Sequence, residues 1–142
     1  VYSEYFSSQT GNRVYLKPEN MQYTGAYKVR GAYYKISTMS EDARQKGLIT
    51  ASAGNHAQGV AFAAKKYGVK ATVVMPTTTP LIKVNRTKGY GAEVILYGNV
   101  YDEACRYTCC KTATTNRNKN IINSWKLFNN LHCDRTLTCC NI

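Results

Sequence analysis

Two kinds of apolar pattern alternate along this chain. Three short runs are rich in apolar and β-branched residues and are bounded by turn-forming residues: 48–51, 71–75 and 92–96. Such runs predict buried strands. The stretches between them repeat apolar residues at helical spacing, and the first places four on one face: Ala57, Val60, Ala61 and Ala64. Strands that alternate with helices predict a parallel sheet joined by right-handed crossovers.

Glycine and proline mark the predicted helix ends. Gly68 ends the helix that follows the first strand. Thr79 is predicted to be the N-cap of the next helix, with Pro80 in its first position and its end near Gly89. A last helix is predicted to begin around Tyr101. An open parallel sheet binds ligands outside the carboxyl ends of its strands, so the loops after each strand are the candidate sites.

The first forty residues have a weaker pattern. Residues 13–17 alternate in character, which predicts a short strand. A helix is predicted from Thr24 as its N-cap, in which four apolar residues recur at helical spacing: Val29, Ala32, Tyr33 and Ile36. In this register Lys28 lies in the first turn.

Composition narrows the class of protein. With 142 residues, 44% hydrophobic and 19% charged, the chain is predicted to form a globular domain with its own core. No apolar run has membrane-spanning length and no signal-peptide arrangement opens the chain, so we expect a cytoplasmic protein. The first residue is Val1 rather than Met, from which we expect that the natural N-terminus is missing.

Net charge and cysteine content suggest nucleic-acid binding and a metal site, but the arrangement of these residues supports neither. The net charge of +11 permits nucleic-acid binding, but the basic residues are scattered and do not alternate with aromatics. A solvated basic surface is therefore the favoured interpretation, and a nucleic-acid-binding module the remote one. The six cysteines form no C-x-x-C pair, so no zinc or other metal site is predicted.

Two stretches carry candidate chemistry. Most helical lysines are solvated, but the positive end of a helix dipole and burial both disfavour the ammonium form, so Lys28 is a candidate nucleophile toward aldehydes. The turn from Ser52 to His56 leads from a strand into a helix, and Gly54 exposes backbone N–H groups there that suit an anion. Taken alone, this second stretch is more often an ordinary capped helix.

Together these motifs resemble a known family. Residues Val1 to about Arg106 resemble the N-terminal part of threonine ammonia-lyases, which are fold type II pyridoxal-phosphate-dependent enzymes. The resemblance runs through five segments: 19–21, 24–33, 50–62, 73–84 and 91–105. It implies a three-layer α/β fold of the tryptophan synthase β type, of which this chain holds the small domain and only the start of the large one. The implied division is 1–40 for the large domain with the lysine helix, 41–106 for the small α/β domain, and 107–142 for an aberrant tail.

The resemblance also implies roles for individual residues. Lys28 would hold pyridoxal 5'-phosphate covalently and act as the catalytic base. Tyr27 would pack on the cofactor ring, and Asn55 would hydrogen-bond its phenolic oxygen. The substrate carboxylate would be bound by four residues of one turn: Ser52, Gly54, Asn55 and His56. For His56, a packing or capping role is an almost equally good interpretation.

The implied reaction is a β-elimination. L-Threonine would give 2-oxobutanoate and ammonia, and L-serine would give pyruvate. The resemblance also implies a homodimer or tetramer that acts on these small molecules. Its metabolic role would be in isoleucine biosynthesis or in catabolism. Ala53 stands where serine racemases of the family carry a serine that acts as the base on the opposite face, so racemisation is disfavoured. His56 distinguishes the chain from the cysteine synthase branch.

The end of the chain departs from the family. No glycine follows Gly98, so the family's glycine-rich phosphate loop is missing. Residues 107–142 hold no glycine, proline or glutamate and do not continue the alternation of strands and helices. The favoured interpretation is an out-of-frame translation, and a native but divergent ending is the weaker one. We therefore expect weak activity or none from this chain alone. The alternatives are a non-catalytic fragment and another fold type II enzyme such as a serine racemase.

Overall fold

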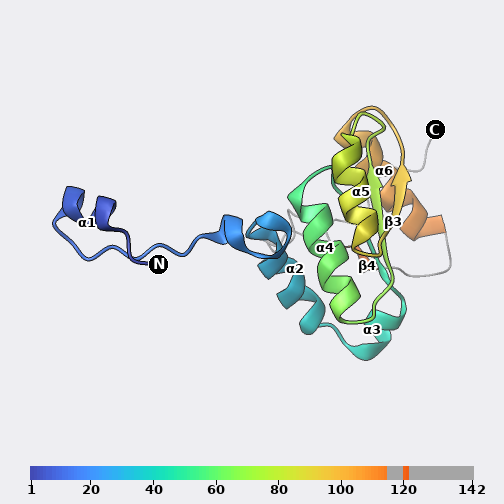
Figure 1. Ribbon diagram of the computed structural model, residues 1–142. Coiled ribbons are helices and arrows are strands. Elements are labelled where there is room, and N and C mark those ends of the chain that lie inside the picture. The colour runs from blue at the N-terminus through green and yellow to red at the C-terminus, as the bar shows by residue number, and fades with distance from the viewer. Residues whose placement is uncertain (115–119, 122–142) are drawn as a thin grey trace.

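A computed structural model describes residues 1–114 and 120–121 (Figure 1). Six α-helices lie in the described residues: α1 (Glu4–Thr10), α2 (Lys28–Ser37), α3 (Glu41–Gln45), α4 (Asn55–Lys66), α5 (Leu81–Gly89) and α6 (Tyr101–Thr114). Two short 3₁₀ turns precede α2: η1 (Glu19–Met21) and η2 (Tyr23–Gly25). Four strands complete the described elements: β1 (Leu48–Ala51), β2 (Ala71–Met75), β3 (Glu93–Leu96) and β4 (Asn120–Ile121).

The strands form one parallel sheet in the order β3-β2-β1-β4. Leu48 pairs with Ala71 at the start of β1, and Thr72 pairs with Glu93. Because every pairing is parallel, the carboxyl ends of β1, β2 and β3 share one edge, and the loops after Ala51, Met75 and Leu96 lie along it. The predicted α/β class and its three main strands are confirmed.

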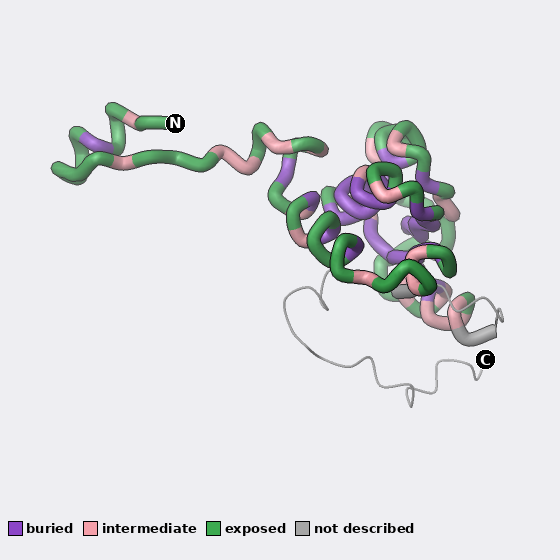
Figure 2. Tube along the Cα trace, turned by 90° about the horizontal axis from the view of Figure 1, so that it is seen from below, coloured by how far each residue is buried: buried purple, intermediate pink, exposed green. Residues whose placement is uncertain are grey.

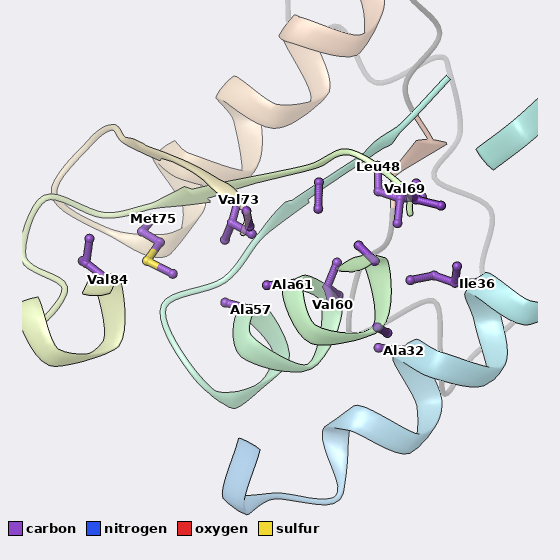
Figure 3. Packing of buried hydrophobic residues seen from close by; sticks show 14 residues of the cluster. Ala32, Ile36, Leu48, Ala57, Val60, Ala61, Val69, Val73, Met75 and Val84 are labelled. Atoms are coloured by element: carbon purple, nitrogen blue, oxygen red, sulfur yellow. The ribbon is translucent and has the colours of Figure 1, made fainter. Parts of the chain in front are cut away.

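Helices cover both faces of the sheet. On one face, α4 and α5 pack against Leu48, Val73 and Met75, in the core that Figure 3 shows from close by. On the other face, α6 contributes Ala104 to a smaller cluster with Ile49, Ala51 and Val74. Neighbouring apolar residues of β1 and of β2 point to opposite clusters, as the two-residue period of a strand requires. The predicted three-layer arrangement is therefore confirmed.

The lysine helix lies against this core. Val29, Ala32 and Ile36, at helical spacing along α2, are its buried residues. Ala32 and Ile36 belong to the same core cluster as β1 and α4 (Figure 3). Ser40 then caps α3, accepting a hydrogen bond from the Ala43 N–H at 3.3 Å. Packing against α4 thus fixes the helix that begins with Lys28.

The N-terminal segment extends away from the layered body (Figures 1 and 2). The strand predicted at 13–17 is wrong: the structure shows there only an isolated antiparallel bridge between Tyr15 and Tyr2. Tyr15 is 62% exposed, and no described strand lies beside it to form a ladder. Helix α1 was not expected, although Ser3 as its N-cap and Gly11 at its left-handed end are visible signals in the sequence.

Two predicted helix starts are corrected. Thr24 is not an N-cap, because its φ of 67° is left-handed and it lies inside a 3₁₀ turn; α2 begins four residues later. Thr79 is not the N-cap of α5 either: Pro80 occupies that position, with an extended ψ of 133°, and Leu81 is the first helical residue. In both cases the chain completes a tight turn before the helix forms, which local propensity does not reveal.

Helix α6 runs on to Thr114, across the predicted limit at 106/107. The rest of the predicted aberrant tail, apart from β4, falls outside the described residues. The divisions at 40/41 and 106/107 stay predictions. Among the described residues, no helix combines the length and apolar character needed to cross a bilayer.

Candidate active site

Lys28 is the first residue of α2, as predicted for the first turn. Tyr27 occupies the N-cap position with helical dihedral angles and no side-chain cap. Lys28 itself is half-buried. Its amine therefore lies at the positive end of a helix whose first N–H groups lack intrahelical acceptors.

Two contacts hold the start of α2. Arg30 forms an ion pair with Glu19 of the preceding turn η1, whose side chain is 22% exposed. The Nζ atom of Lys28 lies 5.0 Å from the centre of the Tyr27 ring, which is within the range of a cation–π contact. Tyr27 is 52% exposed, so one side of this pair faces solvent. The structure thus brings together the amine and the aromatic ring that the sequence predicted to act on one ligand.

The turn after β1 is shaped by Ser52. Its backbone N–H donates to the Val74 carbonyl at 3.0 Å and continues the ladder with β2 by one residue. Its Oγ accepts a hydrogen bond from the Gly54 N–H at 3.3 Å. Gly54 is the N-cap of α4 in an extended conformation, and Asn55 is its first residue. Ser52 therefore organises the turn from within, and Asn55 is exposed at the carboxyl edge of the sheet.

This geometry changes how the turn can bind an anion. The Gly54 N–H already donates to Ser52, so the N–H groups in the first turn of α4 are the donors that remain for a carboxylate. His56 is 4% exposed. That burial favours the packing interpretation for His56, with its backbone N–H as the group that could face a ligand. The roles predicted for these residues stay predictions.

Gly59 is where the two motifs meet. It lies in α4 one helical turn after Asn55, and a Cβ atom built on it would be 3.1 Å from the Lys28 carbonyl carbon and 3.1 Å from the Val29 nitrogen. The backbones of α2 and α4 therefore approach closely at Lys28. Sequence reasoning missed this contact, although a glycine inside an alanine-rich helix is a signal for close helix packing.

A separate hollow of about 410 Å³ lies nearby. Its lining combines residues from the turn before α2, from α4 and from the end of α5: Thr24, Gly25, Gln58, Arg86, Gly89 and Tyr90. Neither Lys28 nor Asn55 lines it. Sequence reasoning assigned no role to this set. Across the described part of the chain, no group of three His, Cys, Asp or Glu side chains could hold a metal ion.

Comparison with known sequences identifies relatives. The sequence profile of a family described as "Pyridoxal-phosphate dependent enzyme" matches residues 1–138. An L-threonine ammonia-lyase of Thermotoga maritima is 55% identical over 104 residues, which are 73% of this chain and 26% of that protein. The catabolic L-threonine dehydratase TdcB of Staphylococcus aureus is 55% identical over 108 residues, which are 75% of this chain and 31% of that protein.

Comparison with solved structures agrees. The processed form of threonine deaminase isoform 2 from Solanum lycopersicum is 40% identical with a TM-score of 0.78, covering 86% of this chain and 33% of that one. Serine racemase from Dictyostelium discoideum is 32% identical with a TM-score of 0.77, covering 87% of this chain and 39% of that one. The chain spans between a quarter and a third of the length of the curated relatives above.

Proposed function

This chain belongs to the fold type II pyridoxal-phosphate-dependent enzymes, and on that premise we propose that it carries the lysine side of a threonine ammonia-lyase site. The observation that carries the proposal is the close approach of α2 and α4 at Lys28 and Gly59. This contact supports the proposal because the backbone of Lys28 lies against the helix that begins with the proposed anion-binding turn. The names of the relatives support the reaction class.

The residues present fit one side of such a cofactor. The aldehyde of the cofactor reacts with an amine, and Lys28 supplies one at the first, half-buried position of α2. The ring of an aromatic ligand needs a flat apolar neighbour, and the Tyr27 ring lies 5.0 Å from that amine. Asn55 adds a polar side chain at the exposed start of α4.

In the proposed site, Lys28 would hold the cofactor, Tyr27 would pack on its ring and Asn55 would hydrogen-bond its phenolic oxygen. When bound, pyridoxal phosphate supplies an aldehyde and an electron sink for the carbanion. The first turn of α4 would bind the carboxylate of the amino acid through its backbone N–H groups, oriented by the Ser52 and Gly54 turn.

Lys28 would also move the proton. In its released form the Nζ amine would accept the proton from the substrate Cα. Fixing the carboxylate at the start of α4 would hold the substrate beside the helix that carries Lys28, because the two helices are in contact at Gly59. Loss of the β-hydroxyl and hydrolysis would then convert L-threonine to 2-oxobutanoate and ammonia, and L-serine to pyruvate.

A racemase is the second candidate, favoured by the likeness to serine racemases from Dictyostelium discoideum and maize. Racemisation needs a base on each face of the Cα atom. Ala53, in the turn between Ser52 and Gly54, has no titratable group to serve as the second base. Elimination is therefore the better proposal for this site.

We expect the chain by itself to turn over threonine weakly or not at all. The matched residues span only 26% and 31% of the length of two curated relatives. The activity of a whole enzyme is part of the proposal, and the names of the relatives support it. The dimeric or tetrameric assembly is what the family resemblance implies, and the cytoplasmic location is an expectation from the sequence. A fragment without catalysis is the alternative.

Covalent labelling tests the proposal. The purified chain is incubated with pyridoxal phosphate and reduced with borohydride, and the modified lysines are located by peptide mass. We expect labelling at Lys28 above that at the other lysines, and its loss in Lys28→Ala. Lys35→Ala, which removes an exposed lysine of the same helix, is the matched control and should leave the pattern unchanged. Uniform labelling of all lysines would contradict the assignment.

A further inference from the structure

Gly59 contacts main chain rather than side chain. A Cβ atom added there would lie 3.1 Å from the Lys28 carbonyl carbon, 3.2 Å from its carbonyl oxygen and 3.1 Å from the Val29 nitrogen. Backbone atoms cannot rotate out of the way as a side-chain end can. A methyl group at Gly59 would therefore push the start of α2 outward by a few tenths of an ångström.

This contact lies on a defined face of α4. Asn55, Gly59, Ala63 and Tyr67 follow at intervals of four residues, so they lie one above another along the helix and just past its end. Ala63 is fully buried, and the Tyr67 ring meets the Tyr33 ring of α2 at 4.8 Å between centres. The side chains along this seam grow from nothing to methyl to phenol with distance from Lys28. Gly59 is the position of this seam at which an added Cβ atom would meet the main chain of Lys28, one turn from Asn55.

We propose that Gly59 is a positioning residue that sets the spacing between the Lys28 amine and the anion-binding turn at Asn55. This rests on the proposed function, because it assumes that Lys28 and Asn55 act on one ligand. Gly59 offers no group for chemistry. Its contribution is the absent Cβ, which lets the backbone that carries Lys28 approach α4 (Figure 3 shows the two helices side by side).

The test compares three variants of the full chain. Gly59→Ala widens the contact at Lys28. Gly89→Ala adds the same methyl group to a helical glycine of α5 with no atom within 4 Å, and is the matched control. Ala63→Ser adds a hydroxyl group to the same face of α4, one turn farther from Lys28 and at a fully buried position. Urea unfolding followed by circular dichroism gives the stability of each variant separately.

The readout is covalent and independent of turnover. The Lys28 amine condenses with the aldehyde of pyridoxal phosphate with loss of water, and hydride from borohydride reduces the C=N bond to a stable amine. The fraction of Lys28 modified is measured by peptide mass at several cofactor concentrations. Since a 1 Å misplacement can cost about a hundredfold, we expect a few tenths of an ångström to lower labelling in Gly59→Ala about three- to tenfold. Gly89→Ala and Ala63→Ser should label Lys28 as the unchanged chain does.

Each outcome decides the matter. A folded Gly59→Ala that labels like the unchanged chain would overturn the positioning role and leave the proposed function intact. If Gly59→Ala does not fold, Ala63→Ser is the deciding variant. Unchanged labelling of Lys28 in a less stable Ala63→Ser chain would support the positioning role of Gly59. Labelling that falls together with the free energy of unfolding would overturn that role. An unchanged chain in which Lys28 labels no better than the other lysines would overturn the proposed function, and the role of Gly59 with it.

Discussion

Gly98 shows how one residue shapes the carboxyl edge of the sheet. Its φ is +72°, and its carbonyl accepts hydrogen bonds from the Thr77 N–H at 2.7 Å and the Thr77 hydroxyl at 2.9 Å. The next residue, Asn99, donates its N–H to the Glu103 carboxylate at 2.6 Å. The loops after β2 and β3 are thus joined to each other and to the start of α6. This joint lies on the same edge as the Ser52–Asn55 turn.

Gly98→Ala is predicted to be more damaging than an ordinary substitution of a turn glycine. An added Cβ would lie 2.5 Å from the Glu103 Cβ, in addition to the strain of a left-handed alanine. Gly68→Ala is the matched control, since its φ of +65° carries the same strain with nothing within 4 Å. We expect about 1–2 kcal/mol of destabilisation for Gly68→Ala and about 1–3 kcal/mol more for Gly98→Ala, measured by urea unfolding. Equal losses would show that the Glu103 contact relaxes freely.

At the scale of elements, the helix pair α2 and α4 carries the candidate site. Contacts join the two helices at the Tyr33 and Tyr67 end as well as at the Lys28 and Gly59 end. The hydrogen bond with Tyr33 and burial both raise the pKa of Tyr67, against the opposing effects of Ser37 and Arg44. The Arg44 guanidinium also lies 5.3 Å from the centre of the Tyr67 ring. Polar contacts at this end therefore complement the glycine contact at Lys28.

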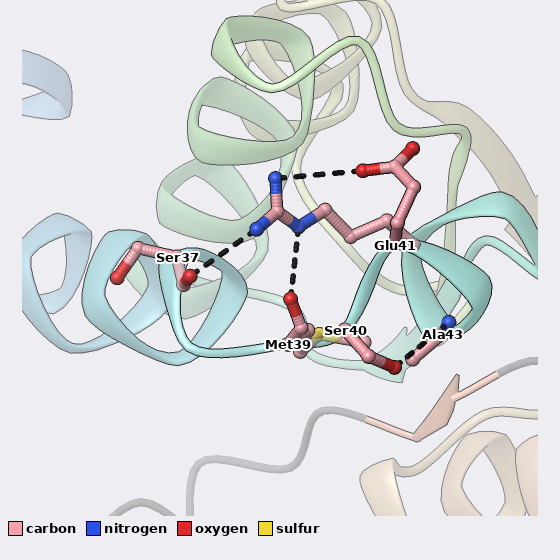
Figure 4. A network of polar contacts seen from close by, with 6 residues as sticks. Ser37, Met39, Ser40, Glu41 and Ala43 are labelled. Carbon is pink, nitrogen blue, oxygen red and sulfur yellow. Dashed lines mark hydrogen bonds and ion pairs between the residues drawn. The ribbon is translucent and has the colours of Figure 1, made fainter.

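Arg44 joins α2 to α3 (Figure 4). Its Nε donates to the Met39 carbonyl at 3.1 Å and its Nη2 donates to the Ser37 carbonyl at 3.3 Å, while the Glu41 carboxylate is 3.9 Å from Nη1. Glu41 is exposed, so that ion pair adds little. Ser37 is the last residue of α2, whose final C=O groups have no intrahelical partner, and Met39 lies just beyond it. The Arg44 guanidinium therefore caps this end of the helix.

Arg44→Ala is therefore predicted to lower the free energy of unfolding by about 1–3 kcal/mol, through two lost charge-assisted hydrogen bonds and the contact with Tyr67. Arg106→Ala, at an exposed position of α6, is the control and should change it by less than about 0.5 kcal/mol. Urea unfolding followed by far-ultraviolet circular dichroism measures both. A loss in Arg44→Ala no larger than in Arg106→Ala would mean that water replaces the guanidinium without cost.

At the scale of the whole molecule, the chain divides into a layered body and an N-terminal arm, residues 1–16. The backbone hydrogen bonds recorded for the arm are internal: Leu16 donates to the Val1 carbonyl at 2.7 Å, and Ser3 donates to the Val14 carbonyl at 3.0 Å. Neither core cluster contains a residue of the arm. Its exposed aromatic residues include Tyr5 and Phe6, and most of the arm carries the colour of exposed residues in Figure 2.

Deleting residues 1–16 is predicted to leave the unfolding of the body almost unchanged, within about 0.5 kcal/mol, because no core contact is lost. Ile36→Ala is the positive control: the side chain is fully buried between α2 and the core, so its truncation should cost about 2–5 kcal/mol. Both are read from urea unfolding of the purified chains. A large loss on deleting the arm would show that the arm packs on the body in solution.

The sequence by itself determined the repeating part of the molecule. The runs at 48–51 and 71–75, the alanine face of α4 and Gly68 predicted strands and helices that the structure confirms, because a two-residue or helical period and a left-handed glycine act within a few residues. The helical spacing of Val29, Ala32 and Ile36 also predicted the helix that carries Lys28, although this helix begins later than the predicted cap at Thr24. The family resemblance came from these segments too, and comparison with known sequences confirmed it.

Tertiary structure decided what depends on a distant partner. Residues 13–17 have a strand-like pattern but no ladder, because backbone hydrogen bonds between strands need a neighbour that the pattern does not supply. Thr24 has a capping side chain, yet its left-handed turn follows from how the chain enters α2. Gly59 and Lys28 are thirty-one residues apart in the sequence and in contact in the structure. The apolar period of each helix does not predict where two helices touch. The sequence thus supplied the chemical groups, and helix packing set the distance between them.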